Sequence, residues 1–286
     1  MKLRSMIAAL LVLSFTPTVL YAMEQSVGWH RREDTTALPI TVFHSTQSAN
    51  LPTAQTIFKG EWQFEISHRF QPPFSAGSDA LWGLDGPIYN RLGLSYGVTD
   101  RVMMSVLRSN LEDNLELGAK WRFREGHLKG LPYQLAVMGG LASNTSVGPS
   151  YGPGYRNREA QSYAQFILDA LLADRLALGV VTSYLNNAQI ADTRTLNEVT
   201  VGLNAQLYLA RMFSVFTEWN ASKSYEGLRH DALTFGLEIE TGGHFFKLMA
   251  SNSERPNPTQ FLGGTPIAFT PHQWRFGFNL TRILRF

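Results

Sequence analysis

The chain has 286 residues, of which 44% are hydrophobic, 12% are aromatic and only 17% are charged, whereas a typical soluble protein has about 25% charged residues. It has no cysteine, which excludes disulfides, thiolate metal sites and a cysteine nucleophile. Its formal net charge is +2 and it has no run of Lys and Arg, so we expect no nucleic-acid partner.

The first residues have the layout of a secretory signal peptide. Lys2 and Arg4 precede an apolar run over residues 6–15, and small or neutral residues follow. Pro17 interrupts the segment, which is shorter than the ~20 apolar residues of a transmembrane helix. We therefore predict an exported protein with residues 1–22 as its signal peptide. Without Lys2 and Arg4, 23 basic residues remain beside 23 acidic ones.

A polar segment, residues 23–50, follows the predicted signal peptide. Only "ITVF" at residues 40–43 alternates between polar and apolar positions. The segment has two interpretations, and the sequence leaves both open. It is either a flexible periplasmic tail or, if the rest of the chain forms a barrel, a plug inserted into the barrel lumen.

From residue 61 onward the chain repeats segments of roughly ten residues in which apolar and polar side chains alternate. Clear examples are "EWQFEISHRF" (61–70), "NLELGAKWRF" (114–123), "EVTVGLNAQLYL" (198–209) and "DALTFGLEIE" (231–240). Successive side chains of a strand point to opposite faces, so a period of two predicts strands.

We predict twelve strands from this alternation. They lie near residues 61–70, 90–98, 101–109, 114–124, 132–142, 159–171, 175–185, 196–208, 212–222, 230–240, 244–252 and 272–286. One stretch, "AQFILDALLADRLALGV", is rich in Ala and Leu and also fits an amphipathic helix. We assign it as two strands joined at residues 173–174.

The connections between these strands alternate in length. "GVTD", "LADR", "LAR" and "TGGH" follow even-numbered strands, with "REGHLKG" (124–130) as a longer exception. The long connections, at residues 71–89, 143–158 and 253–271, follow odd-numbered strands. Short and long ends that alternate, with both termini on the short side, are typical of an outer-membrane barrel. A soluble β-sandwich also has alternating strands, but it does not need aromatic residues at the strand ends.

Aromatic residues do gather at the ends of the predicted strands, where the two membrane interfaces would lie. We predict interfacial positions for Trp62, Phe70, Tyr96, Trp121, Phe123, Tyr133, Tyr184, Trp219 and Trp274. Backbone groups in hydrocarbon must all be paired, so strands can span it only as a closed barrel. The predicted fold class is therefore all-β. It is a single antiparallel up-and-down transmembrane β-barrel of twelve strands over residues 51–286, in the bacterial outer membrane.

In such a barrel the polar side chains of each strand face the lumen. The charged ones are Glu65, Arg69, Arg91, Glu116, Lys120, Arg122, Asp169, Glu198, Glu218, Glu238, Glu240, Lys247 and Arg275. They either line a channel with charged rings or fill the interior as neutralised ion pairs. A barrel of twelve strands is intermediate between a barrel of eight strands, whose interior is filled by side chains, and a barrel of sixteen strands, which encloses an aqueous pore. We expect a narrow or gated lumen without strong selection of either sign.

The chain ends "HQWRFGFNLTRILRF", with apolar residues on one parity up to the final Phe286. We expect this strand to pair with the first strand, and Phe286 to act as the C-terminal signal for the barrel-assembly machinery. Arg282 interrupts the lipid-facing row. A lipid-facing charge costs only ~0–1 kcal/mol near an interface, against ~2–4 kcal/mol at the midplane. We therefore expect Arg282 at the periplasmic rim.

Residues 51–123 resemble the DUF5777 family of predicted outer-membrane β-barrels. The resemblance is carried by "HRF" at residues 68–70, "GLD" at 83–85 and "YGVTDR" at 96–101. It covers about a quarter of the chain at the level of motifs and implies a barrel fold. It implies no activity and no cofactor.

The remaining motifs do not indicate catalysis. Ser95 lies in a G-x-S-x-G pattern inside an alternating strand, whereas a nucleophile elbow needs a strand-to-helix turn. The histidines show no metal-ligand spacing, and His68 is expected at an interface. His230, near Ser222 and Ser224, is the only loose candidate for a lipid hydrolase.

A glycine-rich stretch at residues 148–158 suits a long surface loop that folds over the pore. We thus expect no enzyme, no metal and no cofactor. The leading hypothesis is a channel for small polar solutes in the outer membrane, whose lipids would surround it. The alternative is a sealed scaffold for a periplasmic or cell-surface protein, and a lipid hydrolase is a remote third.

Overall fold

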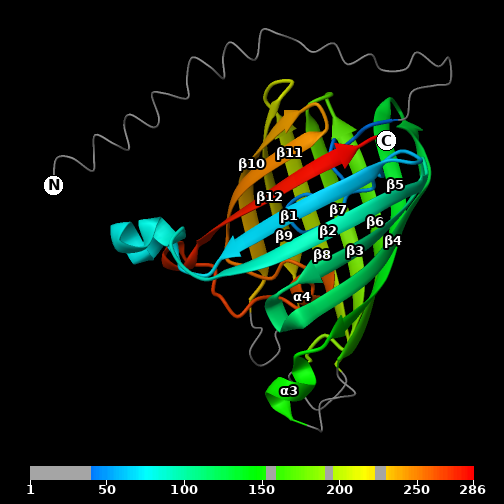
Figure 1. Cartoon of the computed structure of the whole chain (residues 1–286). Coiled ribbons are helices and arrows are strands. Elements are labelled where there is room, and N and C mark those ends of the chain that lie inside the picture. Colours follow the sequence, from blue (N-terminus) through cyan, green and yellow to red (C-terminus); the bar gives the residue numbers. More distant parts are fainter. Residues whose placement is uncertain (1–39, 153–158, 191–195, 223–229) are drawn as a thin grey trace, which may run out of the picture. The chain divides into compact units, whose positions relative to one another are not determined.

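The computed structural model describes residues 40–152, 159–190, 196–222 and 230–286, and it places them in one closed antiparallel barrel (Figure 1). The strands are β1 (Trp62–Phe70), β2 (Ile88–Thr99), β3 (Val102–Ser109), β4 (Asn114–Leu128), β5 (Leu131–Asn144), β6 (Ala160–Leu172), β7 (Leu176–Asn186), β8 (Glu198–Tyr208), β9 (Phe213–Ala221), β10 (Ala232–Thr241), β11 (His244–Ser251) and β12 (Arg275–Leu284). The predicted signal peptide, residues 1–22, and residues 23–39 lie outside the described residues.

Each strand pairs with its neighbours in the chain, and β12 pairs with β1 to close the ring. In this last pairing Trp62 lies opposite Leu284 and His68 lies opposite Phe278. All twelve predicted strands are present, and the stretch that also fitted a helix forms β6 and β7. The predicted fold class is confirmed. Within the described ranges, no helix is long and apolar enough to cross a membrane.

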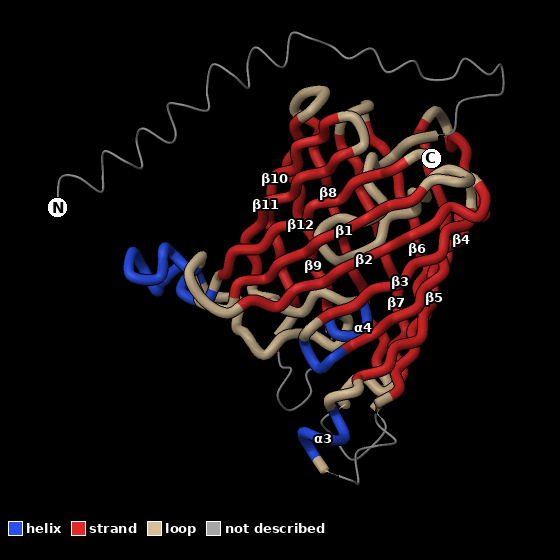
Figure 2. The backbone as a smooth tube through the Cα atoms, viewed as in Figure 1, coloured by secondary structure: helices blue, strands red, loops and turns tan. Residues whose placement is uncertain are grey.

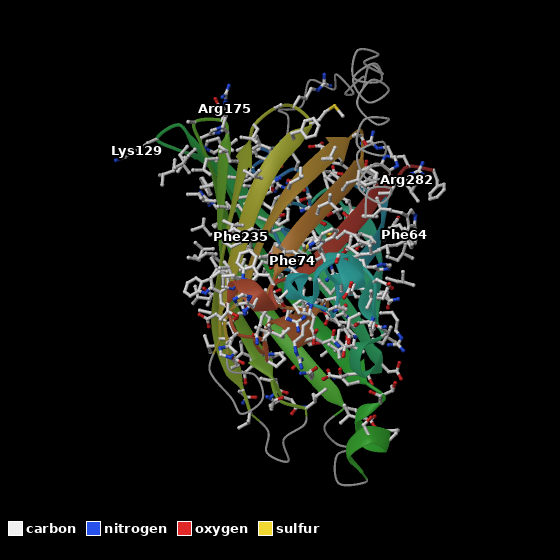
Figure 3. The ribbon with its side chains drawn as sticks, turned by 90° about the vertical axis from the view of Figure 1, so that its left-hand side faces the viewer. Phe64, Phe74, Lys129, Arg175, Phe235 and Arg282 are labelled. Carbon is white, nitrogen blue, oxygen red and sulfur yellow. The ribbon has the colours of Figure 1, made fainter. Side chains whose placement is uncertain are left out.

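Burial alternates along the strands, and on most of them the polarity of a soluble protein is inverted, although β6 and β7 also bury apolar residues such as Ile167 and Val181. On β8, Val199 and Leu203 are 66% and 42% exposed, whereas Thr200 and Asn204 are buried. The exposed apolar side chains face the hydrocarbon, and the buried polar ones face the lumen. Figure 3 shows Phe64 and Phe235 on this outer surface.

The barrel has a turn end and a loop end. At the turn end, tight connections join β2 to β3, β4 to β5, β6 to β7, β8 to β9 and β10 to β11. The loop end has the long connections, which include the helices η1 (Phe74–Gly83), η2 (Leu111–Asp113), α3 (Val147–Tyr151), α4 (Pro258–Phe261) and η4 (Pro271–Gln273). Lys129, Arg175 and Arg282 lie toward the turn end (Figure 3).

Two expected boundaries are wrong. The predicted connection "REGHLKG" is mostly strand, because β4 and β5 continue beyond the alternating region and leave only Lys129–Gly130 as the turn. Both turn residues have a positive φ, 51° and 86°, which fits a tight two-residue hairpin. The terminal strand is shorter than residues 272–286. Phe286 lies beyond it and is 98% exposed.

Two segments outside the strand ladder run inside the ring. The first is residues 40–57, drawn in blue, which pass behind the front strands in Figure 1. The second is the part of the β11–β12 loop over residues 256–265, which carries α4. Figure 2 shows such loop segments crossing the space that the strands enclose. Most residues of 42–57 and of 256–265 are buried.

The register yields a prediction about the position of the bilayer. Leu248 is outward-facing at the middle of β11, opposite Leu237 and Phe278, whereas His244 faces outward at the turn end opposite Arg282. We expect Leu248→Arg to lower the free energy of unfolding by about 2–4 kcal/mol, because a midplane charge loses its hydration. Urea unfolding in phospholipid vesicles measures this loss. The matched control, His244→Arg, should cost only about 0–1 kcal/mol. Equal losses for the two variants would contradict this placement.

Candidate functional site in the barrel lumen

The lumen contains most of the charged side chains that the sequence assigned to it. All of them except Glu240 and Arg275 are buried. Glu240 is partly exposed near the turn end, and Arg275 is partly exposed near the loop end. Glu198 is buried on β8 and has an interaction partner.

These charges are sorted by sign around the barrel wall. Among the described strands, β6 to β10 carry only acidic lumen charges, namely Asp169, Glu198, Glu218, Glu238 and Glu240. The other strands carry all the lumen bases, namely Arg69, Arg91, Lys120, Arg122, Lys247 and Arg275, together with Glu65 and Glu116. We call these two regions the acidic wall and the basic wall. The sorting leaves an electrostatic field across the lumen rather than along it.

The first interior segment turns its backbone N–H groups toward the acidic wall. The carboxylate of Glu218 accepts hydrogen bonds from the backbone nitrogens of Ala49, Asn50 and Leu51, at 3.0, 2.9 and 3.0 Å. It also accepts one from the Asn50 side chain at 2.7 Å. Farther along, the backbone nitrogen of Ala54 donates to Asp169 at 2.6 Å. The acidic wall is thus neutralised partly by main-chain dipoles.

The same segment turns its carbonyl groups toward the basic wall. Lys120 donates to the carbonyl oxygens of Thr46 and Thr53, at 2.8 and 2.9 Å. Lys247 donates to the carbonyl oxygens of Gln47 and Ser48 at 2.5 and 2.7 Å, and to Glu238 at 2.9 Å. Arg69 donates to the carbonyl of Ala49 at 3.4 Å and to the side chain of Asn50 at 2.9 Å. The peptide dipoles of residues 46–54 therefore lie along the field between the two walls.

His44 holds the segment at the turn end. Its ring hydrogen-bonds to Glu240 at 2.5 Å and stacks on Tyr208, with a centroid separation of 4.3 Å. Burial alone would lower the pKa of His44, but the hydrogen bond to Glu240 and the charges of Glu240 and Glu238 raise it above the usual 6.5. Nearby, Val42 and Phe43 pack with Ala177 in a small apolar cluster.

The β11–β12 loop occupies the lumen from the loop end. Glu116 accepts hydrogen bonds from the backbone nitrogen and the hydroxyl of Thr259, at 3.2 and 3.0 Å. Asn257 caps α4 and donates to Asn114 at 2.5 Å. This short helix therefore has buried polar anchors on β4. The position of this loop in the lumen was not predicted from the sequence, although the capping sequence "NPTQ" and the following Phe261 and Leu262 are signals of a short buried helix.

The two interior segments are linked inside the barrel. Arg91 donates to Glu65 and to the carbonyl of Pro256 in the loop. Glu65 in turn accepts a hydrogen bond from the Gln47 side chain at 2.7 Å. Apolar contacts join the same two segments, because Leu51 and Ala54 share a buried cluster with Phe261 and Leu262. The two interior segments are thus linked through the Arg91–Glu65 pair and through one shared apolar cluster.

Part of the lumen wall keeps unused hydrogen-bonding capacity. Both amide atoms of Asn204 and Asn220, and the hydroxyl of Thr200, are buried without a hydrogen-bond partner. These residues are only 3%, 0% and 1% exposed. Asn204 lies directly opposite Glu218 in the β8–β9 pairing. A neutral polar patch therefore adjoins the carboxylate that holds the first segment.

The structure places the predicted interfacial aromatics at two levels of the outer surface. Toward the turn end lie Trp62, Tyr96, Trp121, Phe123 and Tyr133, and toward the loop end lie Phe70, Tyr184, Trp219 and Trp274. Phe123 is the extra residue of a bulge between Arg122 and Arg124. Two such levels are typical of aromatic belts at the interfaces of a bilayer.

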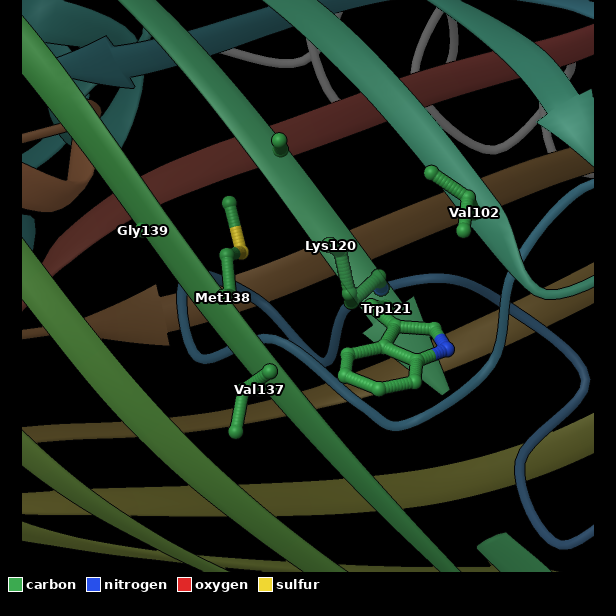
Figure 4. Close-up of a pocket in the computed structure, with 7 residues that line it drawn as sticks. Val102, Lys120, Trp121, Val137, Met138 and Gly139 are labelled. Atoms are coloured by element: carbon green, nitrogen blue, oxygen red, sulfur yellow. The ribbon is translucent and has the colours of Figure 1, made fainter. Parts of the chain in front are cut away.

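Figure 4 shows a hollow of about 320 Å³ beside one of these aromatics. It is lined on the lipid-facing side by Val102, Ala119, Trp121, Val137 and Gly139. Ala119 and Gly139 are small, so the hollow lies between the larger side chains around them. Lys120 and Met138 complete its lining.

The structure describes only part of the motifs that were considered for catalysis. Ser95 is 6% exposed and lies within β2, so it isn't at a strand-to-helix turn. His230 pairs through its backbone with Thr265, while Ser224 and residues 153–158 lie outside the described residues. His68 packs against Phe278 on the outer surface. In the described part of the chain, no group of acidic and histidine side chains could hold a metal ion.

A family described as a membrane bound beta barrel domain (DUF5777) matches residues 43–284. The match thus begins inside the first interior segment. No curated protein sequence matches the chain.

Several solved structures are similar in fold. The KdgM porin has a TM-score of 0.50 at 10% identity, and the alignment covers 77% of this chain and 98% of that one. The COG4313 outer membrane channel from Pseudomonas putida F1 has a TM-score of 0.49 at 10% identity, and the alignment covers 81% of this chain and 98% of that one. The NanC porin has a TM-score of 0.47 at 9% identity, and the alignment covers 79% of this chain and 99% of that one. At this identity the KdgM likeness shows the barrel fold alone, and the two lower scores carry no further argument.

The raised pKa of His44 predicts that docking of the first segment depends on pH. The charged contact with Glu240 is complete below about 6.5 and is lost as the pH rises through the raised pKa, because the imidazole then loses its proton. Backbone amides around residues 40–46 should therefore exchange hydrogen several-fold faster at about pH 9 than at about pH 6, after correction for intrinsic exchange. His44→Gln should remove this difference. An unchanged difference in that variant would assign it to another group.

Proposed function

Because the chain belongs to the DUF5777 family of membrane-bound β-barrel domains, we propose that it is an outer-membrane channel for small polar solutes whose lumen is gated. The supporting observation is the way residues 40–57 fill the lumen. They are held by hydrogen bonds to charged side chains of both walls, including Glu218 and Lys120. Such contacts can be exchanged for contacts with water or with a polar solute.

A permanently filled core would have a different composition. Charged residues are almost never fully buried in ordinary protein cores unless they are paired, yet this lumen buries Arg69 and Lys120, which bind amide and carbonyl oxygens. These side chains would be well solvated in a water-filled pore. The net contribution of a hydrogen bond to a charged group is only about 1.5–3 kcal/mol, so a few such bonds can hold the segment reversibly.

The proposed channel is non-enzymatic, and its solute would meet both signs of charge during passage. The aromatic belts would contact outer-membrane lipids. Phe286, exposed beyond β12, would be available to the barrel-assembly machinery during biogenesis. The predicted signal peptide fits export to this membrane.

One observation favours the alternative of a sealed scaffold for a periplasmic or surface partner. The two interior segments meet in an apolar cluster that includes Leu51 and Phe261. Such a contact closes the lumen from both ends and is more stable in water than a purely polar contact. Electrical conductance distinguishes a gate from a permanent seal.

Glu218→Gln provides the test. The amide keeps the size of the carboxylate but loses the charge that holds Ala49, Asn50 and Leu51. A loss of about 1.5–3 kcal/mol corresponds to a roughly 10- to 100-fold higher ratio of open to closed states. Recordings in planar bilayers should show rare openings of the wild-type channel and frequent openings of the variant.

The matched control is Asp174→Asn, the same chemical change at an exposed turn residue between β6 and β7. It should behave like the wild type. If all three proteins stay silent while the variant's residues 40–57 become accessible to protease, the channel proposal fails. A stoichiometric protein partner that co-purifies with such a silent barrel would then support the scaffold.

A further inference from the structure

The lumen recognises the main chain of the segment that fills it more than its side chains. Lys120 binds two carbonyl oxygens, Lys247 binds two more, and Glu218 binds three consecutive backbone N–H groups. Main-chain groups are the same in every peptide. A wall that binds residues 46–54 in this way has the donors and acceptors to bind another short peptide once that segment has moved aside.

The sorting of charge gives this site a polarity. N–H groups meet the acidic wall at Glu218 and Asp169, whereas carbonyl groups meet the basic wall at Lys120, Lys247 and Arg69. A free peptide has the same polarity with full charges, an ammonium at one end and a carboxylate at the other. Charge-assisted hydrogen bonds are roughly twice as strong as neutral ones. A small zwitterion therefore matches the lumen better than the peptide dipoles that now occupy it.

The unpartnered amides support the presence of a ligand beside Glu218. Asn204 and Asn220 are almost fully buried and face the lumen, yet neither amide has a hydrogen-bond partner. Buried polar groups are normally paired, and an unpaired one costs about 1–3 kcal/mol. Each amide offers both a donor and an acceptor, as a peptide group requires. The interior segment does not use this capacity, so it remains for a solute.

Leu51 indicates which side chain such a solute would have. It packs in the buried apolar cluster with Ile167 and Val181. A Cβ atom added at Gly202 would lie only 2.6 Å from its side chain, so the glycine leaves the space that Leu51 fills. When the segment moves, this space becomes a pocket for one medium-sized apolar side chain next to Glu218.

We propose that the lumen is a binding site for short zwitterionic peptides with an apolar side chain, and that residues 46–54 occupy this site in its closed state. This inference rests on the proposed gated channel and names its solute class. Uncharged sugars would leave both walls unneutralised. Singly charged solutes would match only one wall.

Competition with the interior segment tests the proposal on the full-length protein in detergent micelles. The probe is Gly-Leu-Gly, and the readout is hydrogen exchange at the amides of Ala49, Asn50 and Leu51, which become exposed when the segment leaves Glu218. We expect their exchange to accelerate at least about fivefold at saturating peptide. N-acetyl-Gly-Leu-Gly lacks the ammonium, and Gly-Leu-Gly amide lacks the carboxylate. Each of these two peptides should need an at least about tenfold higher concentration than Gly-Leu-Gly to accelerate the exchange equally.

Asn220→Leu separates peptide binding from closure of the gate. Asn220 makes no hydrogen bond with the interior segment, so exchange without peptide should stay as in the wild type. The concentration of Gly-Leu-Gly needed should rise roughly tenfold, because one buried donor–acceptor pair is lost. Equal potency of all three peptides, or no effect of any, would overturn the proposal, as would an unchanged potency in Asn220→Leu.

The exchange readout does not require conduction. A barrel that is electrically silent but shows selective competition would refute the channel and leave the peptide site standing. A barrel that conducts after Glu218→Gln but shows no selective competition would refute the peptide site and leave the channel standing.

Discussion

Charged side chains enclosed by a barrel wall must find partners inside it, and this requirement shapes the whole lumen. Taking a charge out of water costs several kcal/mol unless hydrogen bonds and opposite charges compensate. Here the opposite charges lie mainly on opposite walls, so most cannot pair directly as Lys247 and Glu238 do. The main chain of residues 46–54 bridges them instead, with N–H groups toward Glu218 and carbonyl groups toward Lys120. The interior segment is therefore part of the electrostatic structure of the barrel.

The second interior segment follows the same rule and connects to the first. Glu116 is held by Thr259 of the β11–β12 loop, and Arg91 joins that loop to Glu65, which holds Gln47. A displacement of either segment would leave a charge in the Arg91–Glu65 pair with an unmet hydrogen bond. The two ends of the lumen are consequently not independent, because each closing segment contacts one member of the Arg91–Glu65 ion pair.

Much of this architecture could be predicted from the sequence, because a lipid-facing strand places apolar side chains at alternate positions and most of the strands show this alternation. The lumen charges were predicted only as a mixture of both signs, although their order in the sequence also indicates how they are arranged around the ring. In an up-and-down barrel, chain order is also the order around the ring, and the lumen charges change sign in blocks, with acidic residues from Asp169 to Glu240 and all the bases on either side. The β11–β12 loop was missed for a different reason. Its position depends on contacts with β2 and β4 that leave no periodic signal. The extension of β4 and β5 was missed because strands beyond the bilayer need not alternate.

Closure and opening depend on a balance between two kinds of contact. Burial of an apolar side chain such as Leu51 or Phe261 stabilises the closed state by about 1.5–3 kcal/mol per side chain. Contact with water does not replace this stabilisation when the segment moves. The hydrogen bonds to Glu218, Lys120 and Lys247 differ, since water or a solute can take them over with little net change. The apolar cluster thus sets how firmly the lumen is closed, and the sorted charges set which solute can compete. A solute that supplies both an apolar side chain and opposite charges compensates for each loss at once, whereas a solute with only one of these features leaves the other contact broken.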